Sequence, residues 1–413
     1  MIKNIIFAVL LPCLIALTSY AHQPGQLDTT LISQLLEKHG AGFGNLEHQK
    51  IGNEVQLHFI NKDIPSEHPL LHLPNGLKLS YGDLVTFGGD IFGDEDYPIA
   101  RCKPEDKKSC FLRQFNTLAV NGQKGNEQCS NPLVQVKSIQ KYLSELNKAI
   151  EEAEKKGQTA SEFYLKHSQD ISKALNRLTC GGSFISDYLP FGQYIKLAQV
   201  NFDHFHPDAP AAYKIGHEIA LETAMKAYRE RLANHEDKAQ RWLELAYAQN
   251  AFANHFLTDA FSSGHMRTPR QAIDKDIHLP AVLKLLIANL MHDEDNRLGL
   301  NVINAQGLSW KAYGDGYLFT EEAQMQRLIL TQAMQQSADS VYEVAMTGKP
   351  PKFYPELNLF PDTKALEQLN ETAPLFKVEN GVLLKRTKNH DPYHFEWTSR
   401  WSGLITLLQF KLG

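Results

Sequence analysis

Several features that mark common protein classes are scarce or missing in this 413-residue sequence. Its 5 cysteines include no Cys-x-x-Cys pair, which disfavours a zinc site made of cysteines. Basic residues are not in excess, with 42 Lys and Arg against 47 Asp and Glu, so a general binder of polyanions is disfavoured. There is no Gly-x-Ser-x-Gly motif, which argues against a serine lipase, and there is no internal repeat. What remains is the composition of a globular protein with one large domain or two ordinary ones.

Residues 1–21 have the pattern of a cleaved signal peptide. Lys3 supplies a positive charge, an apolar stretch follows from Ile5 to Leu17, and Ser19-Tyr20-Ala21 is a small-x-small cleavage site. The apolar stretch is shorter than the roughly 18 residues of a membrane span, and an uncleaved anchor is the alternative. We therefore expect a secreted protein, exported across the inner membrane to the periplasm or beyond, whose mature chain begins at His22.

Export changes the interpretation of the cysteines. Cys13 leaves with the signal peptide, and an even number then remains, namely Cys102, Cys110, Cys129 and Cys180. Cysteines of exported proteins commonly form disulfides. Of the three possible pairings we favour Cys102 with Cys110, which closes a short charged loop, and Cys129 with Cys180, which joins the ends of a helical stretch.

Hydrophobic periodicity predicts a mainly α-helical chain. After Pro132, apolar residues recur with the period of about 3.6 residues that marks one face of a helix. Helices are expected at about 132–156, 161–178, 211–233, 239–262, 279–292 and 318–346.

The two ends of the chain differ from this helical part. Thr29 or Thr30 is a possible start of a short helix. Residues 81–98, with many acidic residues and glycines, are expected to form turns, which either carry a functional site or are solvated surface. Residues 376–387 predict a β-hairpin around Asn380-Gly381, with further strands after it. We therefore expect a helical domain over 22–350 with irregular or β additions at both ends, and a small β-rich extension over 351–413.

Histidine is the outlier of the composition, and its distribution suggests metal chemistry. Of the 17 histidines, eight lie between His204 and His292. His255 and Asp259 are four residues apart in a strongly helical segment, so both project from one face and are able to bind one metal ion. His265 follows after Ser262-Ser263-Gly264, where the helix should end, and can approach the same pocket from another direction.

Further donors lie before and after this segment, and together they predict a site for several zinc ions. Zinc accepts such nitrogen and oxygen ligands. The upstream candidates are His204 and His217, and the downstream one is His292 together with Asp295 or Glu294.

The motif His255-x3-Asp259-x5-His265, with the earlier His204-Phe205, resembles the zinc-dependent phospholipase C and single-strand-specific nuclease superfamily. The likeness is greatest to the secreted zinc metallophospholipases C of Gram-negative bacteria and is carried by residues 200–300. It implies a helical bundle of the phospholipase C type that holds two or three Zn²⁺ ions over 22–350. His292 departs from the family pattern, because Asn296 stands four residues on where the family has a carboxylate.

The resemblance implies roles for other residues. An upstream Asp would complete a zinc site, and Asp90, flanked by glycines, is preferred over Asp187. Asp90 is also the candidate for accepting the proton of the attacking water. Arg267 is the candidate for binding phosphate oxygens, with Arg270 as a further one. The amino terminus at His22 is a possible additional metal ligand.

The implied function is hydrolysis of glycerophospholipids to diacylglycerol and a phosphorylated head group. The chain is expected to act as a monomer at the surface of phospholipid membranes or micelles, with no nucleic-acid partner. Phe395, Trp397 and Trp401 and the apolar run after them are candidates for membrane contact. A zinc nuclease of the same superfamily and a non-catalytic, exported metal-binding protein are the alternatives.

Overall fold

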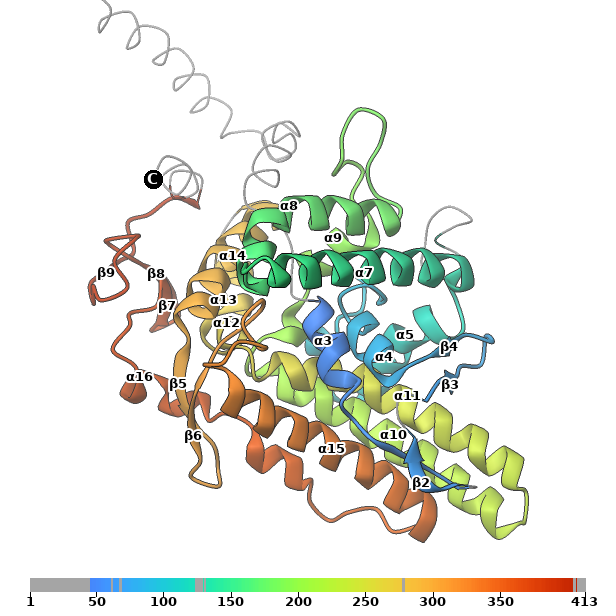
Figure 1. Ribbon diagram of the computed structural model, residues 1–413. Coiled ribbons are helices and arrows are strands. Elements are labelled where there is room, and N and C mark those ends of the chain that lie inside the picture. Colours follow the sequence, from blue (N-terminus) through green and yellow to red (C-terminus); the bar gives the residue numbers. More distant parts are fainter. Residues whose placement is uncertain are drawn as a thin grey trace, which may run out of the picture.

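The computed structural model describes residues 45–60, 62–66, 69–122, 129, 131–276, 279–403 and 406 (Figure 1). The signal segment, His22, the helix expected after Thr29 or Thr30, and His278 lie outside the described residues. Within them the protein is mainly helical, as the sequence predicts. None of the described helices is long and apolar enough to cross a membrane.

Helices make up most of the described structure. The α-helices are α3 (Asn45–Gly52), α4 (Tyr81–Phe87), α5 (Lys107–Ala119), α7 (Pro132–Lys155), α8 (Ala160–Leu178), α9 (Gln193–Gln199), α10 (Asp208–Leu232), α11 (Glu236–Asp259), α12 (Ser263–Arg267), α13 (Arg270–Asp276), α14 (Ala281–Leu298), α15 (Gln324–Thr347) and α16 (Leu366–Leu369). Short 3-10 helices are η2 (Ile99–Arg101), η3 (Pro104–Asp106), η4 (Phe202–His204), η5 (Pro355–Leu359) and η6 (Thr363–Ala365).

The strands are short and form small antiparallel sheets. They are β1 (Leu57–Phe59) with β2 (Lys62–Ser66), β3 (Leu71–His72) with β4 (Lys78–Leu79), β5 (Leu300–Ile303) with β6 (Ser309–Ala312), and β7 (Phe376–Glu379), β8 (Val382–Arg386) and β9 (Trp397–Thr398) in one sheet.

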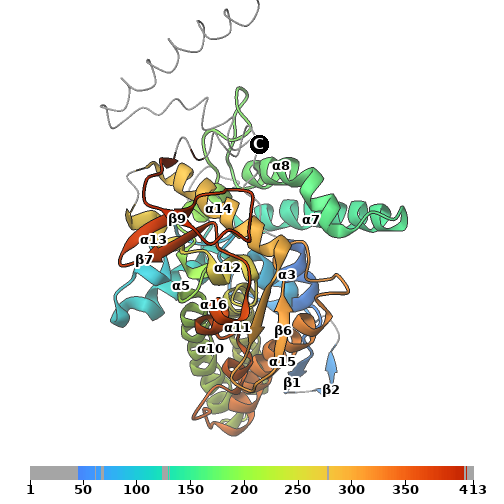
Figure 2. The same cartoon turned by 90° about the vertical axis from the view of Figure 1, so that its left-hand side faces the viewer.

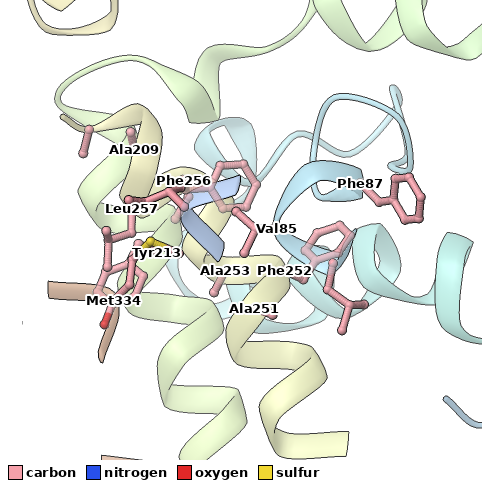
Figure 3. Close-up of a cluster of buried hydrophobic side chains, with 14 of the residues drawn as sticks. Val85, Phe87, Ala209, Tyr213, Ala251, Phe252, Ala253, Phe256, Leu257 and Met334 are labelled. Atoms are coloured by element: carbon pink, nitrogen blue, oxygen red, sulfur yellow. The ribbon is translucent and has the colours of Figure 1, made fainter. Parts of the chain in front are cut away.

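Helix α11 lies at the centre of the core, packed against α10, α15 and α4. Every residue from Ala246 to Asp259 is buried, so this half of α11 is covered on all sides rather than along one stripe. Its alanines let neighbouring helices approach closely, and Phe252 and Phe256 fill the space around them (Figure 3). The side chains that carry metal chemistry at the end of α11 are therefore held in a rigid, fully packed environment.

The predicted helices after Pro132 are confirmed, with shifts at their ends. The segment at 81–98 differs from its prediction, because Tyr81–Phe87 is the helix α4 and not a turn. Ser80 and Asp83 form a capping box at its first turn, and all seven helical residues are buried. Capping and burial thus outweigh the turn-forming tendency of the glycines.

The C-terminal hairpin and both disulfides match the sequence prediction. Strands β7 and β8 pair with Glu379 opposite Val382, and Asn380 and Gly381 between them adopt positive φ angles. Disulfides join Cys102 to Cys110 and Cys129 to Cys180. The β7–β8–β9 sheet lies beside α13 at one edge of the molecule (Figures 1 and 2).

Candidate metal centre

The end of α11 brings a first group of nitrogen and oxygen donors together. His204, His255 and Asp259 are all buried, and one ligand atom of each lies within 4.8 Å of the others. His204 Nδ1 is 2.8 Å from Asp259 Oδ2 and 3.1 Å from His255 Nε2. This arrangement brings together three of the predicted ligands, and the helical spacing of His255 and Asp259 explains why both face it.

Asp90 joins this group from the loop that follows α4. Its Oδ1 lies 3.6 Å from His204 Nδ1, and its Oδ2 lies 3.8 Å from His255 Nε2. Gly89 makes the approach possible, because its φ is +72° and a Cβ atom there would lie 2.8 Å from the His204 ring. Asp187, the other candidate, instead lies in a surface loop where it pairs with Arg177 and Lys173.

His48 on α3 belongs to the same group, although no local pattern in the sequence predicts it. It is grouped with Asp90 and His255, and its Nε2 lies 3.7 Å from Asp259 Oδ1. Its contribution depends on the packing of α3 against α4 and α11, which brings residues some 200 positions apart into contact. No spacing rule within one segment could have identified it.

A second group contains His265, His292 and Asp315. His292 Nε2 lies 3.3 Å from Asp315 Oδ2. Asp259 connects the two groups, because its Oδ1 is 3.3 Å from His265 Nδ1 while its Oδ2 faces His204. The Asp259 carboxylate is therefore placed to contribute one oxygen to each group.

The carboxylate that faces His292 Nε2 is that of Asp315, which corrects the pairing with Asp295 or Glu294. Arg267 donates from Nε to Asp295 Oδ2 over 3.0 Å and also contacts Oδ1. Glu294 forms an ion pair with the buried Arg386. Both acidic residues next to His292 in sequence are thus held by arginines that approach from elsewhere.

The same contacts give Arg267 and Arg270 roles other than the phosphate binding expected for them. Arg267 also donates from its Nη1 to the Thr372 carbonyl oxygen, which ties α12 to the C-terminal segment. Arg270 is fully buried and donates to Asn201 Oδ1 and to the Gln199 carbonyl oxygen. Protein acceptors thus engage the Arg267 guanidinium group and the Nε and Nη2 atoms of Arg270, whose Nη1 is buried without a partner among the described residues.

Asn296 stands at the position four residues after His292. Its Oδ1 accepts a hydrogen bond from Gly264 N over 2.7 Å, and its Nδ2 lies 3.1 Å from His292 Nε2. Gly264 is required there, since a Cβ atom would lie only 2.4 Å from Asn296 Oδ1. The amide of Asn296 thus fastens α12 to α14 and supplies no carboxylate. The carboxylate of the second group comes from Asp315, in the turn after β6.

Glu47, next to His48 on α3, holds that turn in place. Its two carboxylate oxygens accept hydrogen bonds from Gly316 N over 2.7 Å and from Leu318 N over 2.9 Å. Burial and the nearby Asp315 raise the pKa of Glu47 to about 8. One turn of α3 therefore supplies a donor to the first group and an anchor for the second.

Hydrogen bonds from Nδ1 orient three of the histidines so that Nε2 faces the other candidate metal ligands. His255 Nδ1 donates to the Val85 carbonyl oxygen over 2.8 Å. Thr258 Oγ1 donates to the His255 carbonyl oxygen and so accepts from His48 Nδ1, and His292 Nδ1 lies 2.9 Å from Asp293 Oδ1. A neutral imidazole that donates from Nδ1 keeps its lone pair on Nε2, which is how protein histidines are commonly fixed as metal ligands.

Charge within the cluster favours an ionised Asp259. Burial opposes its ionisation, but His255, His265 and His204 hold the pKa of Asp259 well below its usual range. Burial also raises the pKa of Asp90, to about 7, and its Oδ2 accepts no hydrogen bond from the described residues. A buried carboxylate oxygen without a partner is costly, and a bound cation would satisfy it.

His217 lies apart from these donors, contrary to its assignment as a ligand. Its Nδ1 is 2.7 Å from Asn250 Oδ1, and its Nε2 is 3.7 Å from Glu356 Oε1. Tyr213 and Ser337 complete this buried polar network between α10, α11 and α15. The network contains too few metal donors to resemble the centre at the end of α11.

The buried His/Asp groups could therefore hold metal ions, and imidazole with carboxylate is a donor set that suits zinc among the divalent metals. A small pocket beside the centre is lined by His48, Asp259 and Asp315. Searches among family profiles, curated proteins and solved structures found no match for the chain.

Proposed function

We propose that this protein is a zinc-dependent phosphodiesterase of the phospholipase C type. The observation that carries the proposal is the position of Asp259 between two groups of buried histidines, with His204 Nδ1 on one side and His265 Nδ1 on the other. Such donors suit two or three Zn²⁺ ions, which, when bound, activate a water molecule and stabilise negative charge on phosphoryl oxygens. The resemblance of His255-x3-Asp259-x5-His265 to the phospholipase C superfamily, with its helical bundle, supports the same choice.

The chain's own residues have distinct tasks in this proposal. His204, His255, Asp259 and His48 hold the first group, and His265, His292 and Asp315 hold the second. Asp90, with an oxygen that accepts no hydrogen bond from the described residues, accepts a proton from the attacking water. Its raised pKa, near 7, suits that exchange at neutral pH. The product pair is diacylglycerol and a phosphorylated head group, released by an exported, monomeric enzyme.

The test compares lipid and nucleic-acid substrates, each with the metal removed and then returned. Purified protein is incubated with phosphatidylcholine, phosphatidylglycerol and single-stranded DNA, with a chelator and after return of zinc. We expect phospholipid cleavage that the chelator abolishes and zinc restores. DNA cleavage without lipid cleavage would point to a nuclease, and metal binding without turnover of any substrate would point to a non-catalytic metal-binding protein.

A further inference from the structure

The loop between α8 and α9 displays the two most exposed large apolar side chains of the described residues. Phe184 is 106% exposed and Ile185 is 95% exposed, whereas the next, Phe353, reaches 70%. In both views the loop stands out beyond α8, away from the helical body (Figures 1 and 2). Two fully exposed neighbours of this kind at the tip of a projection are unusual for a surface that meets only water.

The loop is held at its base. Gly182 N donates to the Pro190 carbonyl oxygen over 2.8 Å, and Asn176 Nδ2 donates to the Asp187 carbonyl oxygen over 2.9 Å. The disulfide from Cys129 reaches Cys180, just before the loop begins. The base of the loop that carries Phe184 and Ile185 is thus tied to the fold.

The tip of the loop carries no charge, and its two ends are hydrogen-bonded to each other. Ser183 N donates to the Ser186 carbonyl oxygen over 2.7 Å, and Ser186 N donates to Ser183 Oγ over 3.2 Å, so the turn bonds to itself. The four residues at 183–186 are Ser-Phe-Ile-Ser, and the nearest acidic residue, Asp187, is paired with Arg177. Unsatisfied backbone groups and charges are what most oppose entry into a lipid interface.

We infer that Phe184 and Ile185 insert into the surface of a phospholipid bilayer and anchor the protein there. The area decides between a bilayer and a protein partner. Two side chains bury roughly 300–400 Å², about half of the ~800 Å² that each partner of a standard protein interface contributes. A bilayer needs no shape-complementary surround, and apolar side chains at its boundary are stabilised by burial alone. The choice of lipid rests on the proposed function, since a phospholipid substrate presents such a surface.

This loop replaces the C-terminal aromatic residues as the candidate for membrane contact. Trp397 donates from Nε1 to the Pro374 carbonyl oxygen, and Trp401 donates to that of Leu383, so both are tied to the small sheet. Phe395 is 54% exposed, with Tyr393 beside it at 67%. The apolar run after Trp401 lies largely outside the described residues.

Vesicle binding tests the inference on the full chain. The double variant F184S/I185S and the control Y393S/F395S are sedimented with vesicles of phosphatidylcholine and phosphatidylglycerol, after checking that thermal unfolding and zinc content match the unaltered chain. We expect F184S/I185S to bind at least ~10-fold more weakly, because each side chain contributes burial energy, and the control to bind normally. Equal binding by F184S/I185S, or loss confined to the control, would overturn the inference.

A second measurement follows the insertion itself. In F184W, the added tryptophan should be quenched by brominated acyl chains beyond the quenching of the four native tryptophans. No added quenching would also overturn the anchor. Phospholipid hydrolysis is measured separately: vesicle binding through the loop without hydrolysis would refute the proposed function and leave the anchor standing.

Discussion

The Nε2 atom of His292 lies 3.3 Å from the Oδ2 atom of Asp315, a residue in the turn after β6. Asp295, although only three residues from His292 on the same helix, is instead held by Arg267. The second donor group thus obtains its carboxylate from a distant part of the chain.

The first prediction compares these two acidic residues. Asp315→Asn should reduce the number of zinc ions bound per chain while leaving the first group filled, because it removes a charged ligand from the second. Asp295→Asn should keep the full zinc content but lower the free energy of unfolding by about 3 kcal/mol, because it breaks a buried ion pair. Elemental analysis and chemical denaturation distinguish the two, and zinc loss in Asp295→Asn alone would reverse the assignment.

The same residues show how far the sequence predicts the centre. His255 and Asp259 could be found because a helix converts a spacing of four into a shared face, and the helices themselves follow from periodicity. His48 and Glu47 could not, because their places depend on packing between distant segments. Asp295 misled for a related reason: helical proximity to His292 says nothing about an arginine that arrives from another helix.

Asp259 is the subject of the second prediction. Asp259→Asn should lower phosphodiesterase activity at least ~100-fold, because the carboxylate faces His204 on one side and His265 on the other. Activity is measured at saturating zinc, so that weak metal binding and lost function can be separated. Asp237→Asn, an exposed change at the first turn of the same helix, is the control and should be close to normal. Near-normal turnover in Asp259→Asn would exclude a metal-binding role.

Glu47 allows a test of positioning. In Glu47→Gln one oxygen remains to accept a backbone hydrogen bond, so the turn that carries Asp315 should lose one of its two anchors. Zinc affinity of the second group should fall ~10-fold while that of the first is retained, as measured by calorimetric titration. Glu54→Gln, at an exposed contact with Thr331, should leave both affinities unchanged. Equal weakening of both groups would indicate general destabilisation rather than positioning.

His217 should prove structural. His217→Ala removes one buried polar partner of Asn250 and one of Glu356 and leaves a cavity in the network, and we expect a loss of about 2–3 kcal/mol in the free energy of unfolding. Zinc content and turnover of the folded variant should stay normal. His235→Ala, at an exposed histidine paired with Glu230, should change stability by less than about 0.5 kcal/mol. If the folded variant His217→Ala lost one zinc ion, His217 would have to be a metal ligand.

The last prediction concerns protons released when zinc binds. Burial alone would lower the pKa of His204 and His292, but Asp259 and Asp90 raise that of His204 to about 9, and Asp293 and Asp315 raise that of His292 to about 10. Both histidines are therefore protonated at pH 7 in the metal-free protein, and zinc must displace these protons. The apparent zinc affinity should rise with pH from 6 to 9, and the calorimetric heat at pH 7 should depend on the ionisation enthalpy of the buffer. A heat that is the same in phosphate-free buffers of high and low ionisation enthalpy would show that no proton leaves, and that these histidines do not become ligands.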